Sequence, residues 1–203
     1  MTEPAVEPEG LLAWISNTVS TVLRGESLML LGAVALLIAH RHVGAMPPPK
    51  FWPVAPGYWW FATAVVAFLV LPSLAIVVFL HGRFDEYGFR LGRAKEWLIA
   101  VVVLYILVLP FLTYAAGQPQ FREFYPLLPA ARQGGLALIN FETVYGLYFF
   151  SWEFLFRGLL LFGLAQRLGA LAIPIQTVPF ALAHIGKPYP EVYASIVAGL
   201  VLG

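Results

Sequence analysis

The chain has no cysteine, few charged residues and almost no excess of charge of either sign. Only 11% of its 203 residues are charged, and the formal net charge is +1. Without cysteine, disulfides, thiolate catalysis and cysteine-ligated zinc are excluded. Nucleic acid is not an expected partner, because its recognition requires a clustered basic surface that this near-neutral chain does not indicate.

Apolar side chains are in large excess, at 60% of the chain. A typical soluble domain is roughly 45–50% apolar and about 25% charged. A soluble domain of this size cannot hide so much apolar surface, because surface grows nearly as fast as volume in small domains. The composition therefore predicts an all-α, multi-pass transmembrane bundle with membrane lipid as its solvent.

Several apolar segments approach the ~20 residues that a spanning helix needs. Tyr58–Leu80 and Trp97–Ala116 are uncharged and begin with aromatic residues, which anchor spans at membrane interfaces. Leu28–Ala39 is also continuous but shorter, so its helix is expected to start near Val19. Two clean spans and one shorter span are thus predicted in the first half of the chain.

The expected organisation has three parts. A disordered or interfacial leader covers residues 1–18, N-terminal transmembrane helices cover 19–116, and a core with the polar residues covers 117–203. We expect about five or six helices. The last one reaches Gly203 after about thirteen residues, short of the ~20 needed to cross, and is therefore predicted to be truncated within the span.

Three ionisable residues in the last part are candidates for chemistry, because such groups are costly inside spans. Glu153 and Arg157 are four residues apart and share a helix face. Glu153 lies sixteen residues before Gly169 and His184 fifteen after it. In a helical hairpin turning at Gly169, both would lie about 23 Å from the turn. A carboxylate at this level can take a proton from water while a neighbouring donor stabilises the oxyanion.

The sequence around these residues resembles the CAAX protease and bacteriocin-processing family of intramembrane proteases, also called CPBP or Abi. The run S-W-E-F-L-F-R-G over residues 151–158 is similar to the family's first motif, E-E-x-x-x-R-G. The run F-A-L-A-H over residues 180–184 matches its second motif, F-x-x-x-H. The resemblance extends from about Tyr87 to Gly203.

The resemblance implies an intramembrane endopeptidase, a hydrolase that cuts a membrane-associated peptide or protein. It implies that Glu153 is the general base or its close support, and that His184 is a polariser or proton carrier. Arg157 would hold the Glu153 carboxylate in place. The expected pocket residues are Phe180, Trp152 and Glu142. The expected location is a cell membrane, the inner membrane if the source is bacterial.

The chain departs from the family pattern in two ways. Trp152 occupies the position of the first paired glutamate, which leaves open whether Glu153 takes over its role. The family's later motif, a histidine followed by asparagine or a similar residue, does not occur in the chain. No cofactor is expected, because one good ligand histidine without H-E-x-x-H spacing favours metal-independent hydrolysis. The sequence leaves metal dependence open.

Other interpretations remain open. Glu153 and Arg157 can form a purely structural ion pair, which would suit a non-catalytic scaffold or processing partner. A further interpretation is a proton-coupled transporter that uses Glu142, Glu153 and His184 as a proton relay. Such a transporter is expected to contain an inverted repeat or paired broken helices, and the sequence shows neither. Glu142 either extends a polar groove or is a solvated interfacial carboxylate. The pair His40 and His42 is expected to snorkel to the membrane boundary, because no third metal ligand is nearby.

Overall fold

The computed structural model describes residues 10–22 and 24–203, and the regular elements within them are all helical. Four helices there are long and apolar enough to cross a membrane: Gly25–Ala45, Tyr58–Val78, Ala94–Gly117 and Gly135–Ala183. The predicted all-α, multi-pass membrane bundle is confirmed. The first nine residues of the expected leader lie outside the described residues.

The first span begins later than expected. Residues around Val19 belong to a separate helix, α1 (Leu11–Val22), and the span itself is α2 (Gly25–Ala45). The helix α2 also runs past Ala39 and ends just before Pro47, where three consecutive prolines follow. Proline provides no backbone N–H and disfavours helical geometry in the residue before it. The span therefore includes the histidines that were expected at its boundary.

The second span is one rod with a wide turn in its middle. It consists of α3 (Tyr58–Val65), the π-helical segment η1 (Val66–Val70) and α4 (Leu71–Val78). Pro72 lies directly after the wide turn. A proline inside a helix removes a hydrogen bond and crowds the preceding turn, and the π turn gives the chain room for it.

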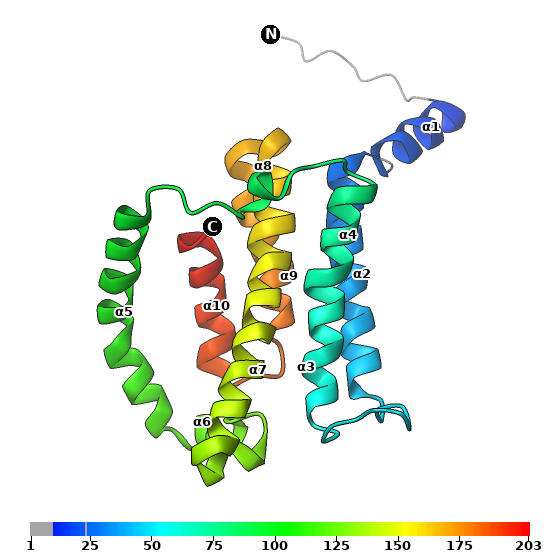
Figure 1. Ribbon diagram of the computed structural model, residues 1–203. Coiled ribbons are helices and arrows are strands. Elements are labelled where there is room, and N and C mark those ends of the chain that lie inside the picture. The colour runs from blue at the N-terminus through cyan, green and yellow to red at the C-terminus, as the bar shows by residue number, and fades with distance from the viewer. Residues whose placement is uncertain (1–9, 23) are drawn as a thin grey trace.

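A charged loop and a peripheral span follow. The loop contains the 3₁₀ turn η2 (Phe84–Tyr87), and the span is α5 (Ala94–Gly117). None of the residues of α5 is buried, and Figure 1 shows this helix standing apart from the others. Its apolar side chains therefore face the surroundings, which in a membrane are lipid. The chain then passes through α6 (Pro119–Phe124) and η3 (Pro129–Gln133).

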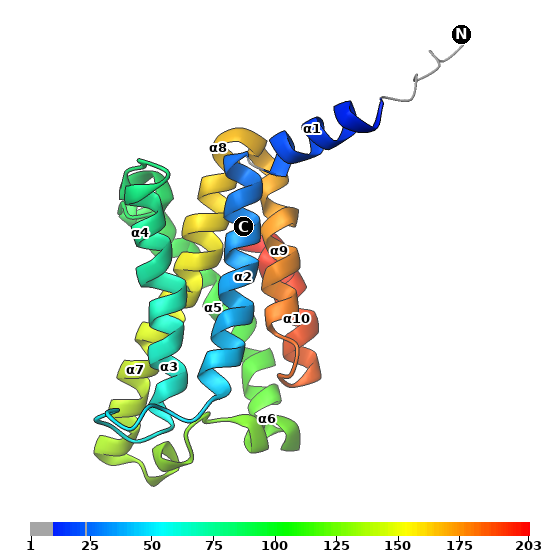
Figure 2. The same cartoon turned by 90° about the vertical axis from the view of Figure 1, so that its right-hand side faces the viewer.

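The last part of the chain forms a helical hairpin and a final helix. Its elements are α7 (Gly135–Glu153), the π segment η4 (Phe154–Phe162), α8 (Gly163–Leu168), η5 (Gly169–Leu171), α9 (Ala172–Ala183) and α10 (Tyr189–Val201). The chain reverses at η5, as expected for Gly169. Figures 1 and 2 show the rod of α7 and η4 in the middle of the bundle, which explains why most of η4 is buried.

Gly158 is expected to be a sensitive position in this central rod. A Cβ there would lie 2.5 Å from the Phe154 ring and 3.1 Å from the backbone oxygen of Tyr87. Overpacking of this kind costs about 1–3 kcal/mol, so Gly158→Ala should lower the thermal unfolding midpoint in detergent. Gly146→Ala in α7 is the matched control, because nothing lies within 4 Å of its added Cβ. Equal midpoints for the two variants would contradict the packing described here.

Candidate functional site

Glu153 is the last residue of α7, directly before the nine-residue π segment η4. Its Oε2 lies 3.4 Å from Nε of Arg157, so the two residues form an ion pair within one helix. The Glu153 side chain is 34% exposed and that of Arg157 only 12%. Both line a cavity of about 160 Å³ that Tyr87 and Phe89 close on the other side. Glu153 therefore faces the charged loop before α5.

Arg157 has hydrogen-bonding capacity that the structure leaves unused. Its Nε and Nη1 are buried and donate no hydrogen bond, although Nε lies 3.4 Å from Oε2 of Glu153. The guanidinium lies 4.1 Å from the centre of the Phe180 ring on α9. Arg157 is thus held between a carboxylate and an aromatic face, with N–H groups available to a further acceptor.

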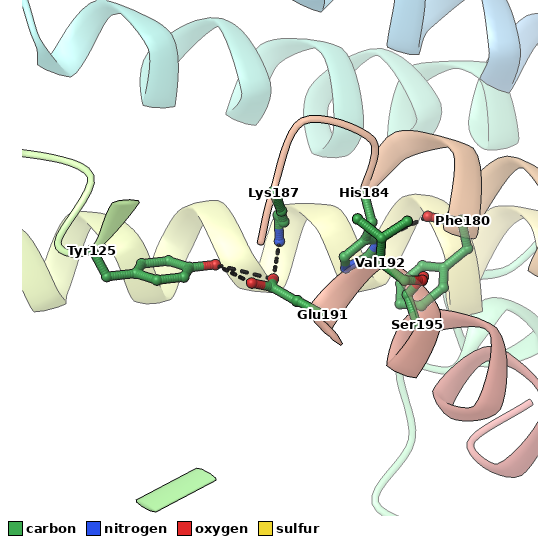
Figure 3. A network of polar contacts seen from close by, with 7 residues as sticks. All are labelled: Tyr125, Phe180, His184, Lys187, Glu191, Val192 and Ser195. Carbon is green, nitrogen blue, oxygen red and sulfur yellow. Dashed lines mark hydrogen bonds and ion pairs between the residues drawn. The ribbon is translucent and has the colours of Figure 1, made fainter. Parts of the chain in front are cut away.

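His184 directly follows the last residue of α9 and is buried. Its Nδ1 lies 2.8 Å from the carbonyl oxygen of Phe180, one turn earlier. Because a carbonyl oxygen only accepts, Nδ1 carries a proton. In the neutral ring Nε2 is then the unprotonated nitrogen. Figure 3 shows the imidazole tied back to its own helix in this way.

Trp152, rather than Glu153, contacts His184. The two rings meet edge to face at 5.6 Å, and the Phe180 ring lies 4.6 Å from His184. Consecutive helical residues point roughly 100° apart, so Trp152 and Glu153 cannot both face α9. No hydrogen bond, ion pair or ring contact joins Glu153 to His184, and the two are linked only through Arg157 and Phe180.

Glu142 lies apart from these residues. It is exposed on α7, eleven residues before Glu153. It does not line the cavity that Glu153 and Arg157 share. Of the six residues expected at the site, the structure thus brings five into one connected group, and Glu142 stays outside it.

A second polar cluster lies next to His184 at the start of α10. The Tyr125 hydroxyl donates to Glu191 at 2.8 Å to Oε2, and Lys187 Nζ donates to Glu191 Oε1 at 2.7 Å (Figure 3). Lys187 also lies 5.7 Å from the Trp152 ring. The pKa of Tyr125 is raised above its ordinary value, first by burial of the phenol and second by the nearby Glu191 carboxylate. The phenol therefore keeps its proton for the hydrogen bond.

The sequence indicates only one of the two contacts in this cluster. Lys187 and Glu191 have the four-residue spacing of a helical ion pair. Tyr125 is 66 residues from Glu191, and nothing in the sequence links the two. Only the folded structure shows that Tyr125, which directly follows α6, is hydrogen-bonded to α10.

Tyr125→Phe is expected to loosen this attachment. A hydrogen bond to a charged group contributes about 1.5–3 kcal/mol, so the thermal unfolding midpoint in detergent should fall. Tyr189→Phe serves as the control, because that side chain is exposed and makes no such contact. An unchanged midpoint for Tyr125→Phe would mean that the Tyr125–Glu191 bond does not form in the membrane protein.

The described residues contain no cluster of three or more histidine, aspartate or glutamate side chains placed to hold a metal ion. The charged groups of the site are instead paired with one another.

The comparison with protein families concerns the last third of the chain. Residues 134–203 match the family model described as Rce1-like, type II CAAX prenyl endopeptidase Rce1-like. This segment is similar to that family. The resemblance expected from the two motifs is therefore confirmed. No match was found among curated proteins or among solved structures.

The Rce1-like segment runs from the start of α7 to the end of α10 and includes all six residues expected at the site. At the level of the family, the match supports a CAAX protease-type membrane endopeptidase, a hydrolase. Tyr125 lies outside the matched segment but is bonded to it through Glu191. The matched elements are therefore supported by contacts from the first two thirds of the chain.

Proposed function

We propose that the protein is an intramembrane endopeptidase that hydrolyses a membrane-associated peptide through water activated by Glu153. The observation that supports this most is the pairing of a partly accessible carboxylate with an arginine whose Nε and Nη1 are buried and donate no hydrogen bond. Both groups border the same small cavity. A cell membrane, the inner membrane if the source is bacterial, is the location that this activity would have.

The proposed reaction assigns one task to each polar group. Glu153 accepts a proton from water as the water oxygen bonds to the peptide carbonyl carbon. The free N–H groups of Arg157 donate to the oxyanion that forms. The C–N bond then breaks, and the leaving amine takes up a proton that His184 is proposed to carry from solvent on Nε2. Glu153 finally returns its proton to the solvent.

The walls of the site are proposed to come from two aromatic residues. Phe180 positions the Arg157 guanidinium through the contact of its ring face. Trp152 occupies the side of the rod that faces His184. A peptide strand entering the site would therefore meet apolar surface on the α9 side and charge on the side of Glu153. No cofactor is part of this proposal.

A non-catalytic scaffold or processing partner is the second candidate. One observation favours it: the residue in contact with His184 is Trp152, which has no ionisable group. Glutamate four residues before arginine is also the favourable order for a purely structural pair. In this interpretation, Glu153 and Arg157 would hold η4 against α9 and the charged loop.

The two candidates are distinguished by incubating the full chain in proteoliposomes with membrane-anchored peptides in ¹⁸O-labelled water. Hydrolysis should give products whose new carboxyl group carries one ¹⁸O atom, detected by mass spectrometry. Proteoliposomes of the Glu153→Gln variant report cleavage by contaminating proteases. Equal labelling in both preparations, or none in either across a broad peptide set, would favour the scaffold.

A further inference from the structure

A second, larger cavity adjoins the central rod at Trp152, and Glu153 is not among its lining residues. Its volume is about 420 Å³, within the ~300–1,000 Å³ typical of small-molecule sites. Residues of α2, the second span, α7 and α9 line it, among them His40, Arg41 and Trp152. Figure 2 shows α2 and α9 running next to one another along this side of the bundle.

His40 gives this cavity an unused hydrogen-bond acceptor. The side chain was expected to snorkel to the membrane boundary, but it is only 4% exposed, because its ring packs against Trp60 and Phe68 at 4.3 and 4.8 Å. Its Nδ1 lies 3.1 Å from Oγ1 of Thr63, and that hydroxyl donates its proton to the Trp60 carbonyl at 2.9 Å.

The protonation of His40 follows from these two bonds. Thr63 has one hydroxyl proton and gives it to Trp60, so its oxygen must accept from His40. Nδ1 therefore carries the proton, and in the neutral ring Nε2 is left with a lone pair. Nε2 is buried without any hydrogen-bond partner. An unpaired buried acceptor is costly, and a ligand that donates a hydrogen bond would remove the cost.

Arg41 gives the same cavity a positive charge. It is exposed in the last turns of α2, and no carboxylate in the described part of the chain forms an ion pair with it. The side chains at the opening are apolar and exposed, namely Ile38, Leu182 and Ile185. In a membrane protein, such an opening faces lipid, so the ligand would enter from the bilayer.

We propose that this cavity binds an anionic phospholipid whose headgroup carries a hydroxyl, such as phosphatidylglycerol. The acyl chain fills the apolar cavity, the phosphate pairs with Arg41, and the headgroup hydroxyl donates to Nε2 of His40. Basic pockets between transmembrane helices bind anionic headgroups in this way. The proposal does not rest on peptidase activity, although the lipid would touch Trp152, which contacts His184.

The test measures which lipid stays with the purified full chain. The delipidated protein is placed in phosphatidylcholine nanodiscs that contain equal amounts of phosphatidylglycerol and phosphatidylmethanol, and bound lipid is measured by native mass spectrometry. These two lipids carry the same charge, but only phosphatidylglycerol has a headgroup hydroxyl. The expected order of retention is phosphatidylglycerol, then phosphatidylmethanol, then phosphatidylcholine.

Two variants test how His40 and Arg41 each contribute to the lipid preference. His40→Asn still offers an amide to Thr63 but has no atom at the Nε2 position, so the preference for phosphatidylglycerol over phosphatidylmethanol should disappear. One hydrogen bond corresponds to about a 2- to 10-fold preference. Arg41→Gln should lower retention of both anionic lipids about fivefold relative to phosphatidylcholine. His42→Asn is the control, because His42 is exposed on the same helix and should change nothing.

Several results would overturn the proposal. Equal retention of the two anionic lipids by the unaltered protein would remove the role of His40, and an unchanged Arg41→Gln variant would remove that of Arg41. Slower peptide cleavage by His40→Asn with unchanged lipid retention would make the cavity a peptide subsite instead. If His40→Asn fails to fold, Thr63→Val is used in its place. This variant keeps the imidazole but removes the hydroxyl oxygen that accepts from Nδ1, so the proton no longer has a fixed position on Nδ1. The preference for phosphatidylglycerol over phosphatidylmethanol should therefore fall.

Discussion

Glu153→Gln is expected to lower kcat/KM for peptide cleavage by about 100- to 10,000-fold, the range for losing a general base. The amide has nearly the size and shape of the carboxylate but cannot accept a proton from water. The variant should still enter the membrane and elute as folded protein, because the Gln amide oxygen remains next to the Arg157 guanidinium and can still accept a hydrogen bond from it. Initial cleavage rates in proteoliposomes and elution profiles in detergent measure both quantities.

Glu142→Gln is the matched control for this result. Glu142 lies on the same helix but is exposed and away from the cavity that Glu153 and Arg157 share. Its substitution should leave kcat/KM for peptide cleavage within about twofold of the unaltered protein, because surface substitutions usually change the free energy by less than ~0.5 kcal/mol. A Glu153→Gln enzyme with full activity would exclude Glu153 as the base, whatever the state of the control.

Arg157→Met is expected to be the most destabilising of the substitutions considered. It removes the charge partner of Glu153 and the cation over Phe180 while keeping a long apolar side chain. Breaking a fully buried ion pair by removing one partner costs roughly 3–5 kcal/mol; because Glu153 is 34% exposed and therefore partly hydrated, the expected loss lies below that range. The thermal unfolding midpoint in detergent should fall, and Arg157→Lys should recover part of the loss.

Arg93→Met provides the comparison for an exposed pair. Arg93 and Glu96 are also close in sequence and 3.2 Å apart, but both side chains are well exposed. Surface pairs contribute only about 0–1 kcal/mol, so this variant should unfold almost as the unaltered protein does. Similar losses for Arg93→Met and Arg157→Met would show that burial does not set the strength of the Glu153–Arg157 pair.

The variants of Glu153 and Arg157 together separate the two proposed functions. For a peptidase, Glu153→Gln removes activity without loss of folded protein. For a structural pair in a scaffold, either substitution lowers folded yield by a similar amount. Adding Glu153→Gln to Arg157→Met should then restore stability in both cases, because the double variant leaves no unpaired charge.

The sequence determined the class of the protein and the identity of the candidate residues. Apolar runs such as Tyr58–Leu80 specify spanning helices, because a chain in lipid must satisfy its backbone hydrogen bonds within each segment. The contact between Glu153 and Arg157 follows from their spacing of four residues, since helical geometry alone brings such side chains together. The two motifs likewise located the Rce1-like segment.

Tertiary structure decided which side chains face one another. Trp152 and Glu153 are neighbours in the sequence, and only the packing of the central rod of α7 and η4 against α9 determines that Trp152 faces His184. Composition could not show that His40 is buried, because its surroundings come from another span. The bond between Tyr125 and Glu191 was equally invisible, since contacts between distant segments depend on how whole helices pack and leave no periodic signal in the sequence.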